Sequence, residues 1–405
     1  MSGSPLDIDA GAWNALLETQ SHPTPFMRHA YLAALQQSGS ATPETGWAPR
    51  FLTLWQGDAL VAACPLYLKN HSYGEYVFDW AWARAYDAHG LPYYPKAVVA
   101  VPFTPVPGSR LLARDAAARA LLLQALRDWC QAQGVSSLHL LFGSQEDIQA
   151  CAQAGLMLRH TVQFHWNNAA PAPLPTTAGT EGAVGTRGYA DFEAFLASLS
   201  QDKRKKIRQE RRRVAEAGVT FRWVRGADST RADWDFFYRC YERTYLEHGN
   251  PPYLTRDFFA RLHSGMPQHW LLCIAERAGQ PIASSLIAIS ADPSSAGGQK
   301  DQNSSPLTAY GRYWGALERV DCLHFEACYY QPLQWCIAHG VQRFEGGAQG
   351  EHKMARALLP VQASSAHWLA HPAFADAVDR FLEREGEGVA QYLDALQTRS
   401  PFRQI

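Results

Sequence analysis

Apolar and polar positions along the chain follow two periods, one typical of helices and one of strands. In the first 166 residues, apolar residues recur at helical spacing over 11–40, 114–133 and 145–154. Alternation and short apolar runs predict strands over 50–69, 97–101, 137–142 and 155–166. Gly57 and Asp58 lie within the first of these stretches and predict a hairpin. This order of elements is typical of a mixed α/β unit.

A second series of elements follows a stretch without apolar periodicity. Residues 167–188 are rich in Asn, Pro, Thr and Gly, and we interpret them as an interdomain linker. The low-complexity segment 291–306 is interpreted as a disordered loop. A helix is expected from Ala373 to about Glu385, with Gly386 as its stop. The other expected helices are 189–200, 203–217, 232–246, 255–263 and 331–339, and the expected strands are 219–224, 270–275, 281–289 and 308–317.

The stretch from His71 to Trp80 mixes aromatic, polar and glycine residues. Strand alternation would place His71 and Glu75 on one face and Phe78 on the other, and neither face would be cleanly apolar. Two interpretations stay open. The stretch is an aromatic edge strand with internal hydrogen bonds, or it presents His71, Glu75 and Asp79 to a substrate.

Composition narrows the class of protein. The chain has 405 residues, 47% of them hydrophobic and 19% charged, which indicates two or three well-cored domains. A formal charge of −1 argues against duplex DNA as a partner. The eight cysteines form no C-x-x-C pair, so we expect reduced thiols, a cytoplasmic location and no metal site. We expect no signal peptide and no transmembrane segment.

One predicted helix is strongly basic. Eight of the eleven residues from Lys203 to Arg213 are Lys or Arg, while Ile207 and Val214 keep a sparse apolar side. A solvated surface helix explains this pattern. A surface that captures a polyanion, such as a cofactor phosphate, a nucleotide-linked substrate or tRNA, explains it equally well.

The densest group of chemically active residues follows a short predicted strand near the C-terminus. Residues 343–353 read Arg-Phe-Glu-Gly-Gly-Ala-Gln-Gly-Glu-His-Lys. Glycines allow a close approach of the backbone to a ligand and direct N–H groups at it. A polar glycine turn is the alternative, but the variety of functional groups favours a site.

Several stretches resemble a bacterial family of predicted N-acyltransferases described as FemAB-like, with two units related to the GCN5-related N-acyltransferase (GNAT) fold. The resemblance is carried by 65–69, 71–79, 93–96, 102–106, 163–166, 310–315, 323–330 and 347–353. It implies α/β (α+β mixed) sheets in tandem GNAT-like domains at 1–166 and 189–405, separated by the linker 167–188. It also implies a cytoplasmic enzyme that uses acetyl-CoA or a longer acyl-CoA and no metal.

Transfer of an acyl group to an amine requires a base, donors for the oxyanion and a site for the acyl carrier. Glu345, Glu351 and His352 are the candidate bases, and Lys353 with the amides of Gly346 and Gly347 is expected to stabilise negative charge. Further binding residues are expected in the loop and on the neighbouring strand and turn: Gln349, Tyr310, Arg312, His324 and Glu326. In the first domain His71, Glu75 and Asp79 are expected to bind the small-molecule or peptide amine.

Two other functions remain open. One is a Fem-type peptidyltransferase that uses aminoacyl-tRNA on a cell-wall precursor, which the basic helix favours. The other is a recognition protein that keeps the fold and has lost transfer. The sequence does not distinguish these two from the acyl-CoA enzyme.

Overall fold

The computed structural model describes residues 1–169, 188–291, 307–347 and 350–403. These residues form two compact units. Unit 1 contains Met1–Val162, Tyr253–Met266 and Gln362–Asp394, and unit 2 contains Gln163–Pro252, Pro267–Val361 and Ala395–Ile405. The units therefore differ from the two contiguous ranges predicted from the sequence, because two segments of the second half pack into unit 1. Most of the predicted linker and of the low-complexity segment lies outside the described residues.

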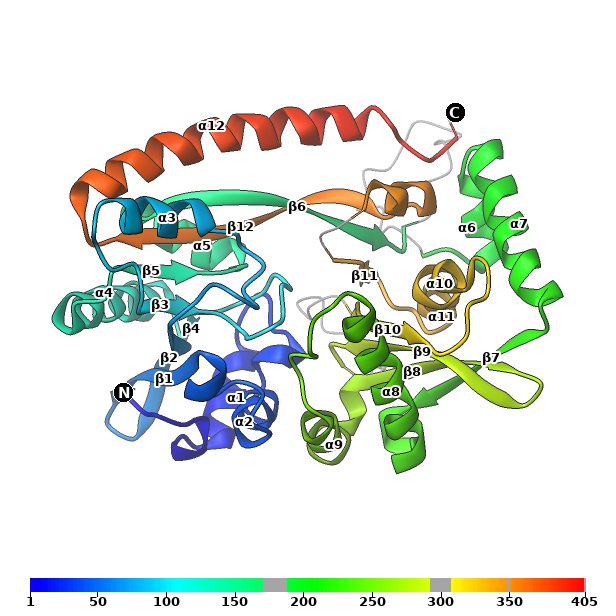
Figure 1. The fold of residues 1–405 in the computed structure, drawn as a ribbon, viewed down its shortest axis with the longest axis horizontal. Helices are drawn as coiled ribbons and strands as arrows, with labels where there is room; N and C mark the ends of the chain where they lie inside the picture. Colours follow the sequence, from blue (N-terminus) through cyan, green and yellow to red (C-terminus); the bar gives the residue numbers. More distant parts are fainter. Residues whose placement is uncertain (170–187, 292–306, 348–349, 404–405) are drawn as a thin grey trace, which may run out of the picture. The chain divides into compact units, whose positions relative to one another are not determined.

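Unit 1 has a mixed sheet in the order β1-β2-β3-β5-β12, with β4 beside β2 (Figure 1). β3 and β5 are parallel and the other neighbours are antiparallel. Its strands are β1 Trp47–Gln56, β2 Ala59–Lys69, β3 Lys96–Val99, β4 Leu112–Ala113, β5 Ser137–Leu140 and parts of β6 Met157–Asn167 and β12 Leu359–Leu369. Its helices are α1 Ala10–Glu18, α2 His29–Gln37, α3 Trp80–Ala88, α4 Ala116–Gln133, α5 Gln145–Gln153, α9 Arg256–Gly265 and most of α12 Pro372–Gln397.

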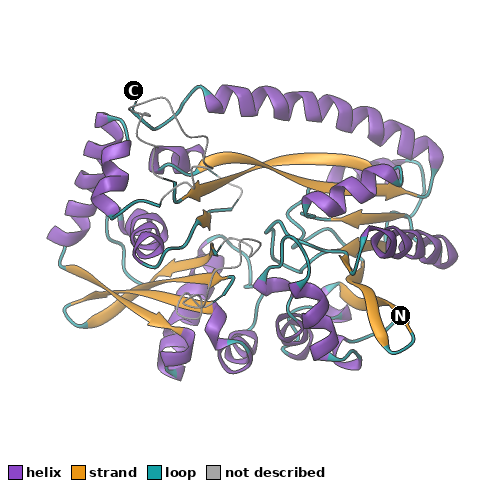
Figure 2. Cartoon of the chain, turned by 180° about the vertical axis from the view of Figure 1, so that it is seen from behind, coloured by secondary structure: helices purple, strands orange, loops and turns teal. Residues whose placement is uncertain are grey.

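Unit 2 has a mixed sheet in the order β6-β11-β10-β9-β8-β7, in which only the pairing of β10 with β11 is parallel. Figure 1 labels these strands, and Figure 2 shows strands in orange and helices in purple from the opposite side. Its strands are β7 Val219–Arg225, β8 Trp270–Arg277, β9 Gln280–Ile289, β10 Thr308–Ala316 and β11 Arg343–Glu345, together with the C-terminal part of β6. Its helices are α6 Phe192–Ser198, α7 Gln201–Glu216, α8 Arg231–Glu247, α10 Leu323–Phe325, the π-helix η7 Glu326–Tyr330 and α11 Gln331–Ala338. Short 3-10 turns are η1 Pro5–Asp7, η2 Pro25–Met27, η3 Pro43–Thr45, η4 Gly226–Asp228, η5 Pro267–His269 and η8 Glu351–Arg356.

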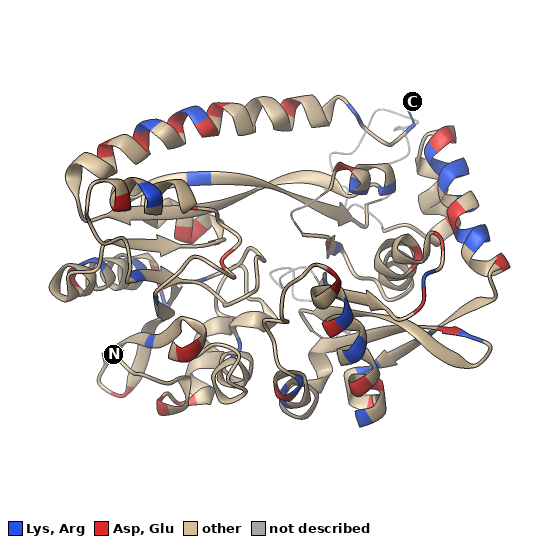
Figure 3. Ribbon diagram, in the orientation of Figure 1, with Lys and Arg blue, Asp and Glu red and all other residues tan. Residues whose placement is uncertain are grey.

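Local signals account for most of these elements. Asp115 caps α4 through the Ala118 N–H, and Gly134 ends that helix at a φ of 64°. Gly57, at a φ of 59°, lies in the turn that joins β1 to β2, as predicted. The predicted basic helix is α7, along which Lys and Arg positions cluster (Figure 3).

Two predicted elements are wrong. The stretch from His71 to Asp79 is a loop, and α3 begins at Trp80. Gly74 and Tyr76 have φ values of 79° and 61°, which a strand does not contain. The C-terminal helix does not stop at Gly386, since α12 continues to Gln397. A glycine ends a helix only where the chain takes the left-handed conformation, and Gly386 keeps helical geometry.

Candidate functional site

The candidate site of unit 2 lies where two parallel strands separate. β10 and β11 pair over three residues only, and the last pair is Tyr310 with Glu345. Beyond it the chain of β11 follows β6, because the Gly346 N–H donates to the Phe164 carbonyl at 3.0 Å. On its other side β10 pairs with β9, and the register shifts between Gly311 and Tyr313. We call the opening between β10 and β11 the fork.

A cavity of about 150 Å³ adjoins the fork. Strand residues form one side of it, and the chain from His324 to Tyr329 forms the other. The residues that line it are Ser285, Leu286, Ile287, Gly311, Arg312, Tyr313, Trp314, His324, Cys328, Tyr329, Phe344 and Gly346. Four of these belong to the predicted site: Arg312, His324 and Gly346 by name, and Phe344 within the glycine-rich stretch.

The π-helix η7 brings Cys328 and Tyr329 to the cavity. Its wider turn is an irregularity that is frequent at functional sites. The Ser285 hydroxyl of β9 donates to the Ala327 carbonyl at 2.8 Å and so joins η7 to the sheet. Burial raises the pKa of the Cys328 thiol, which therefore stays protonated at neutral pH. Neither Cys328 nor Tyr329 was predicted from the sequence to belong to the site.

Two imidazoles stand beside Tyr329. The ring of His324 contacts those of Trp314 and Tyr329, and the His352 Nε2 lies 3.3 Å from the Tyr329 hydroxyl. Burial, the neighbouring His352 and the charge of Arg356 lower the pKa of His324 below its usual range. Burial, with Arg356 and Lys353, also lowers the pKa of His352. Both imidazoles are therefore neutral at pH 7, the form that accepts a proton.

Lys353 and Arg356 hold the glycine-rich loop in place. The Lys353 ammonium donates to the carbonyls of Gly346 and Gly347 at 2.6 and 3.3 Å, and burial lowers its pKa to about 8. The Arg356 guanidinium donates to the His352 carbonyl at 2.8 Å and pairs with Glu210 at 2.8 Å. Lys353 was predicted to be catalytic, and in the structure its ammonium contacts these two loop carbonyls.

Glu345 is the last residue of β11 before the fork. Alternation along the strand turns its side chain away from the cavity that Phe344 and Gly346 line. Its carboxylate lies 3.5 Å from Arg343 Nη1 and 3.8 Å from His165 Nε2. Burial raises the pKa of Glu345 to about 7, against the opposing effect of Arg343. His165 lies in the 163–166 stretch of the sequence, where no spacing could show its pairing with Glu345.

The remaining predicted residues of unit 2 are more scattered. Glu351 is exposed and forms an ion pair with Arg399 at 2.9 Å. Glu326 is buried and pairs with Arg211 at 3.1 Å. Tyr310 is buried at the end of the parallel pairing, and Gln349 lies outside the described residues.

In unit 1 the predicted residues Glu75 and Asp79 meet Lys96, the first residue of β3. The Lys96 ammonium donates to Glu75 at 2.8 Å and also contacts Asp79, and all three side chains are almost fully buried. Burial raises the pKa of Glu75 to about 7. Burial would also raise the pKa of Asp79, but Lys96 and further favourable contacts outweigh it and the pKa is lowered. His71 lies beside Lys69 instead, with its Nδ1 atom 3.5 Å from that ammonium.

Further polar residues extend this buried cluster. The Tyr93 hydroxyl donates to Asp79 at 2.6 Å and lies 3.3 Å from His139, whose Nδ1 is 2.7 Å from the Nδ1 of His367. A lysine at the start of an apolar strand, as in the 96–101 run, is the sequence signal that could have indicated a buried ion pair.

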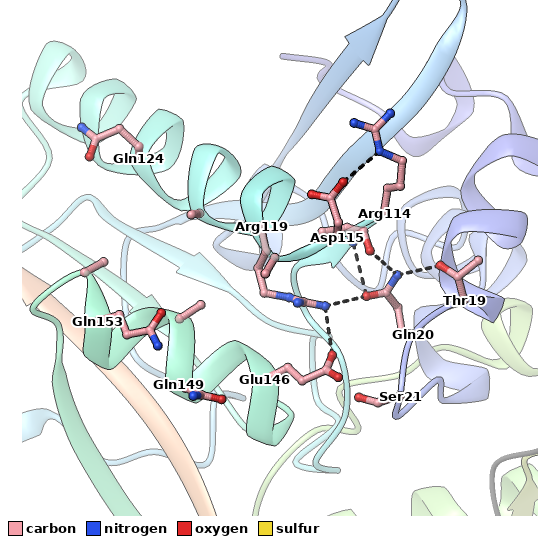
Figure 4. A pocket seen from close by; sticks show the side chains of 15 residues that line it. Thr19, Gln20, Ser21, Arg114, Asp115, Arg119, Gln124, Glu146, Gln149 and Gln153 are labelled. Carbon is pink, nitrogen blue, oxygen red and sulfur yellow. Dashed lines mark hydrogen bonds and ion pairs between the residues drawn. The ribbon is translucent and has the colours of Figure 1, made fainter. Parts of the chain in front are cut away.

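A larger hollow, of about 680 Å³, lies beside α4 and α5 of unit 1 (Figure 4). Its central cation, Arg119, donates to Gln20 at 2.9 Å and to Glu146 at 3.1 Å, as the dashed lines show. Arg119, Gln20 and Glu146 thus bind one another rather than a ligand, so we place the candidate site at the fork of unit 2. In neither unit do His, Cys, Asp and Glu side chains of the described residues gather as a metal site would require.

The fold places this protein in the mixed α/β class, as the sequence predicted. Within that class, the chain belongs to the FemAB-like family, described as peptidoglycan biosynthesis and recognition, whose model matches residues 4–404. Membership of this family supports a transferase of acyl or aminoacyl groups in peptidoglycan-related biosynthesis.

Solved structures share the fold at low sequence identity. FemX is 9% identical with a TM-score of 0.53, over 92% of this chain and 98% of its own. L-PGS from Bacillus licheniformis is 12% identical with a TM-score of 0.53, over 94% and 98%. The C-terminal domain of a putative lysylphosphatidylglycerol synthetase from Agrobacterium fabrum is 12% identical with a TM-score of 0.50, over 93% and 96%. Among proteins with curated descriptions, none matches this sequence.

In the part of the chain that the structure describes, every helix is too short or too polar to cross a lipid bilayer.

Proposed function

We propose that this protein transfers an acyl group from an activated donor, of the acyl-CoA class, to an amine. The observation that carries the proposal is the cavity at the fork, which adjoins the point where β10 and β11 separate. A planar carbonyl group fits between two separating strands, where the backbone can approach it closely. The FemAB-like family supports peptidoglycan-related amines as the acceptors.

The residues beside the cavity can supply the chemistry. The amine nitrogen attacks the thioester carbonyl, a C–N bond forms, and the C–S bond breaks as the thiol leaves. His324, neutral at pH 7, takes the proton that the amine loses and passes it to the leaving thiolate. The Tyr329 hydroxyl, whose pKa burial raises, stays protonated and can donate a hydrogen bond to the oxyanion. His352 supports that hydroxyl.

Cys328 does not serve as a covalent carrier in this scheme. A thiol must lose its proton to become a nucleophile, and burial raises the pKa of Cys328. The transfer is therefore direct, from donor to amine, without an acyl-enzyme.

The proposal is tested by measuring amide formation by mass spectrometry, with acetyl-CoA and amine-bearing peptidoglycan precursors as substrates. We expect the substitution His324→Gln to lower kcat about 10²- to 10⁴-fold, the usual contribution of a general base, with little change in donor affinity. The control is His339→Gln, because His339 lies at the end of α11 and does not line the cavity. Donor binding without amide formation by the natural protein would instead favour a recognition role.

A second candidate is transfer from aminoacyl-tRNA, and the surface of α7 favours it. Lys205, Lys206, Arg208, Arg212 and Arg213 are all exposed on that helix. Arg208 pairs with the exposed Glu193 and Arg212 lies 3.9 Å from Glu216. Exposed pairs of this kind are weak, so these cations can exchange their partners for phosphates.

Replacing Lys205, Arg208 and Arg212 by Glu separates the two candidates. If tRNA is the donor carrier, the natural protein binds tRNA with an affinity that falls steeply with salt, and the triple variant loses this binding. If acyl-CoA is the donor, the variant retains its amide-forming activity, and no tRNA binding is found at physiological salt.

A further inference from the structure

One of the buried residues of the basic helix α7 is a carboxylate. Ile207, Glu210 and Val214 follow one another at helical spacing and are buried, so Glu210 occupies the apolar side of the helix. A buried carboxylate is costly unless it is paired and hydrogen-bonded. The contacts of Glu210 therefore show what it does in the folded chain.

The carboxylate of Glu210 joins two segments that lie apart in the sequence. Its Oε2 atom accepts a hydrogen bond from the hydroxyl of Tyr330, the last residue of η7, and another from Nη2 of Arg356, the last residue of η8, at 2.8 Å. Both partners are almost fully buried. The Cζ atom of Arg356 also lies 3.7 Å from the centre of the Phe325 ring, so the guanidinium is held by a ring and by Glu210.

Each of these two segments carries one residue of the candidate site. η7 brings Tyr329, the neighbour of Tyr330 in the chain, to the cavity. In η8, Arg356 donates to the His352 carbonyl at 2.8 Å, and His352 Nε2 lies 3.3 Å from the Tyr329 hydroxyl. Glu210 thus connects to both members of this pair, and it is not among the described residues that line the cavity.

The next residue of α7 holds the other end of η7. Arg211 Nε donates to the two carboxylate oxygens of Glu326, the first residue of η7, at 3.1 and 3.2 Å, and its Nη2 donates to Gln334 of α11 at 2.8 Å. The π-helix is therefore attached to α7 at its first residue through Arg211 and at its last residue through Glu210.

We propose that Glu210 is a positioning residue for acyl transfer, which fixes Tyr329 and His352 relative to each other. This inference rests on the proposed function. When the imidazole proton is on Nε2, His352 donates to the Tyr329 oxygen and leaves the phenolic proton free for the oxyanion. A donor to an oxyanion is most effective when it is already directed at the place where charge develops. Glu210 supplies that direction by holding η7 and η8 together.

The first test uses the variant Glu210→Gln, which keeps the size of the side chain and removes its charge. We expect kcat for amide formation to fall about 10- to 100-fold and KM for acetyl-CoA to change less than about two-fold, because a catalytic group displaced by about 1 Å loses rate rather than binding. The matched control is Glu216→Gln, the same substitution at an exposed position of α7. A kcat equal to that of the control would overturn the inference.

The assay is made where each variant is fully folded, as urea unfolding establishes. A residue that only stabilises unit 2 would leave the kcat of the folded molecules unchanged. If Glu210→Gln does not fold, Tyr330→Phe replaces it, since this variant removes only the hydroxyl that donates to Glu210. It is expected to lower kcat in the same way, and an unchanged kcat would overturn the inference.

A second readout does not depend on any substrate. The rings of His352 and Tyr329 have their centres 6.0 Å apart, so nuclear Overhauser contacts between them are expected in the natural protein and in Glu216→Gln. We expect these contacts to be lost in Glu210→Gln and Tyr330→Phe, and contacts retained in both would overturn the inference. The variants His352→Gln and Tyr329→Phe identify the signals.

The two readouts separate this inference from the proposed function. Loss of the ring contacts in Glu210→Gln, in a protein that forms no amide from any acyl-CoA, would overturn the proposed function and keep the role of Glu210 in placing the pair. Amide formation with an unchanged kcat in the folded variant would overturn the inference and keep the proposed function.

Discussion

At the scale of single residues, the charged side chains inside this protein matter through their partners. Lys96 is fully buried and contacts the carboxyl groups of Glu75 and Asp79, so these ionisable groups stabilise one another away from water. Removing one member of such a group leaves the others as uncompensated buried charges, which is far more damaging than removing an exposed pair.

The variant Lys96→Met is expected to lower the free energy of unfolding by about 3–5 kcal/mol, the usual cost of breaking a buried ion pair. Urea denaturation followed by circular dichroism measures the change. Arg114→Ala is the control, because the ion pair of Arg114 with Asp115 is exposed and worth at most about 1 kcal/mol. A loss as small as that of the control would show that the buried cluster does not stabilise unit 1.

The buried His139 and His367 predict an acid dependence of stability. Burial lowers the pKa of His139 to about 3 and that of His367 well below its usual value. Both histidines therefore contribute stability above pH 6.5 that is lost as the pH falls toward their folded-state pKa. In this range each histidine makes the free energy of unfolding fall by about 1.4 kcal/mol for each unit that the pH falls. The reason is that the unfolded chain binds a proton that the folded protein does not.

The variant His367→Gln is expected to show a shallower fall of stability between pH 6.5 and 4.5 than the natural protein, measured by urea denaturation at each pH. Glu75 and Glu345 act in the opposite direction, since their raised pKa values favour the folded state at lower pH. The test therefore compares the slope of stability against pH in the variant with the same slope in the natural protein. Identical slopes would contradict a neutral, buried His367.

At the scale of elements, glycines have opposite roles according to their surroundings. A Cβ atom on Gly315 of β10 would lie 1.8 Å from the Cys240 carbonyl of α8, so this glycine sets how closely α8 packs on the sheet. Gly386 lies within α12 with no atom near enough to touch an added Cβ. Replacing glycine by alanine should therefore destabilise the packing of α8 on the sheet at Gly315 and stabilise the helix α12 at Gly386.

Gly315→Ala is expected to destabilise the protein by about 1–3 kcal/mol, the usual cost of overpacking. Gly386→Ala, its matched control, is expected to stabilise it by about 0.5–1 kcal/mol, because alanine loses less conformational freedom in a helix. Thermal and urea unfolding of both variants measure whether each substitution lowers or raises the free energy of unfolding. A neutral Gly315→Ala would contradict the close contact of α8 with β10.

At the scale of the whole molecule, unit 1 is completed by segments distant in sequence. Val378 and Leu382 of α12 pack with Trp82 and Tyr86 in one cluster. In α9, the ring of Phe258 lies 5.3 Å from that of Tyr31. A contiguous first domain would lack both contacts.

The fragment 1–166 alone is therefore expected not to fold cooperatively. Its thermal unfolding by circular dichroism should show no sharp transition, whereas the full chain should show one. A fragment that melts cooperatively at the temperature of the full chain would support the contiguous domain predicted from the sequence.

Helical and strand periodicities and turn glycines act over a few residues, so the types and order of most elements could be predicted from the sequence. The sequence also indicated the family and the glycine-rich stretch beside the fork. Three features became visible only in the folded chain: Cys328 and Tyr329 line the cavity, Glu345 faces away from it, and Lys353 binds loop carbonyls. These features depend on the register of the strands, on the π-helix η7 and on pairings between residues far apart in the chain, which local sequence patterns do not encode.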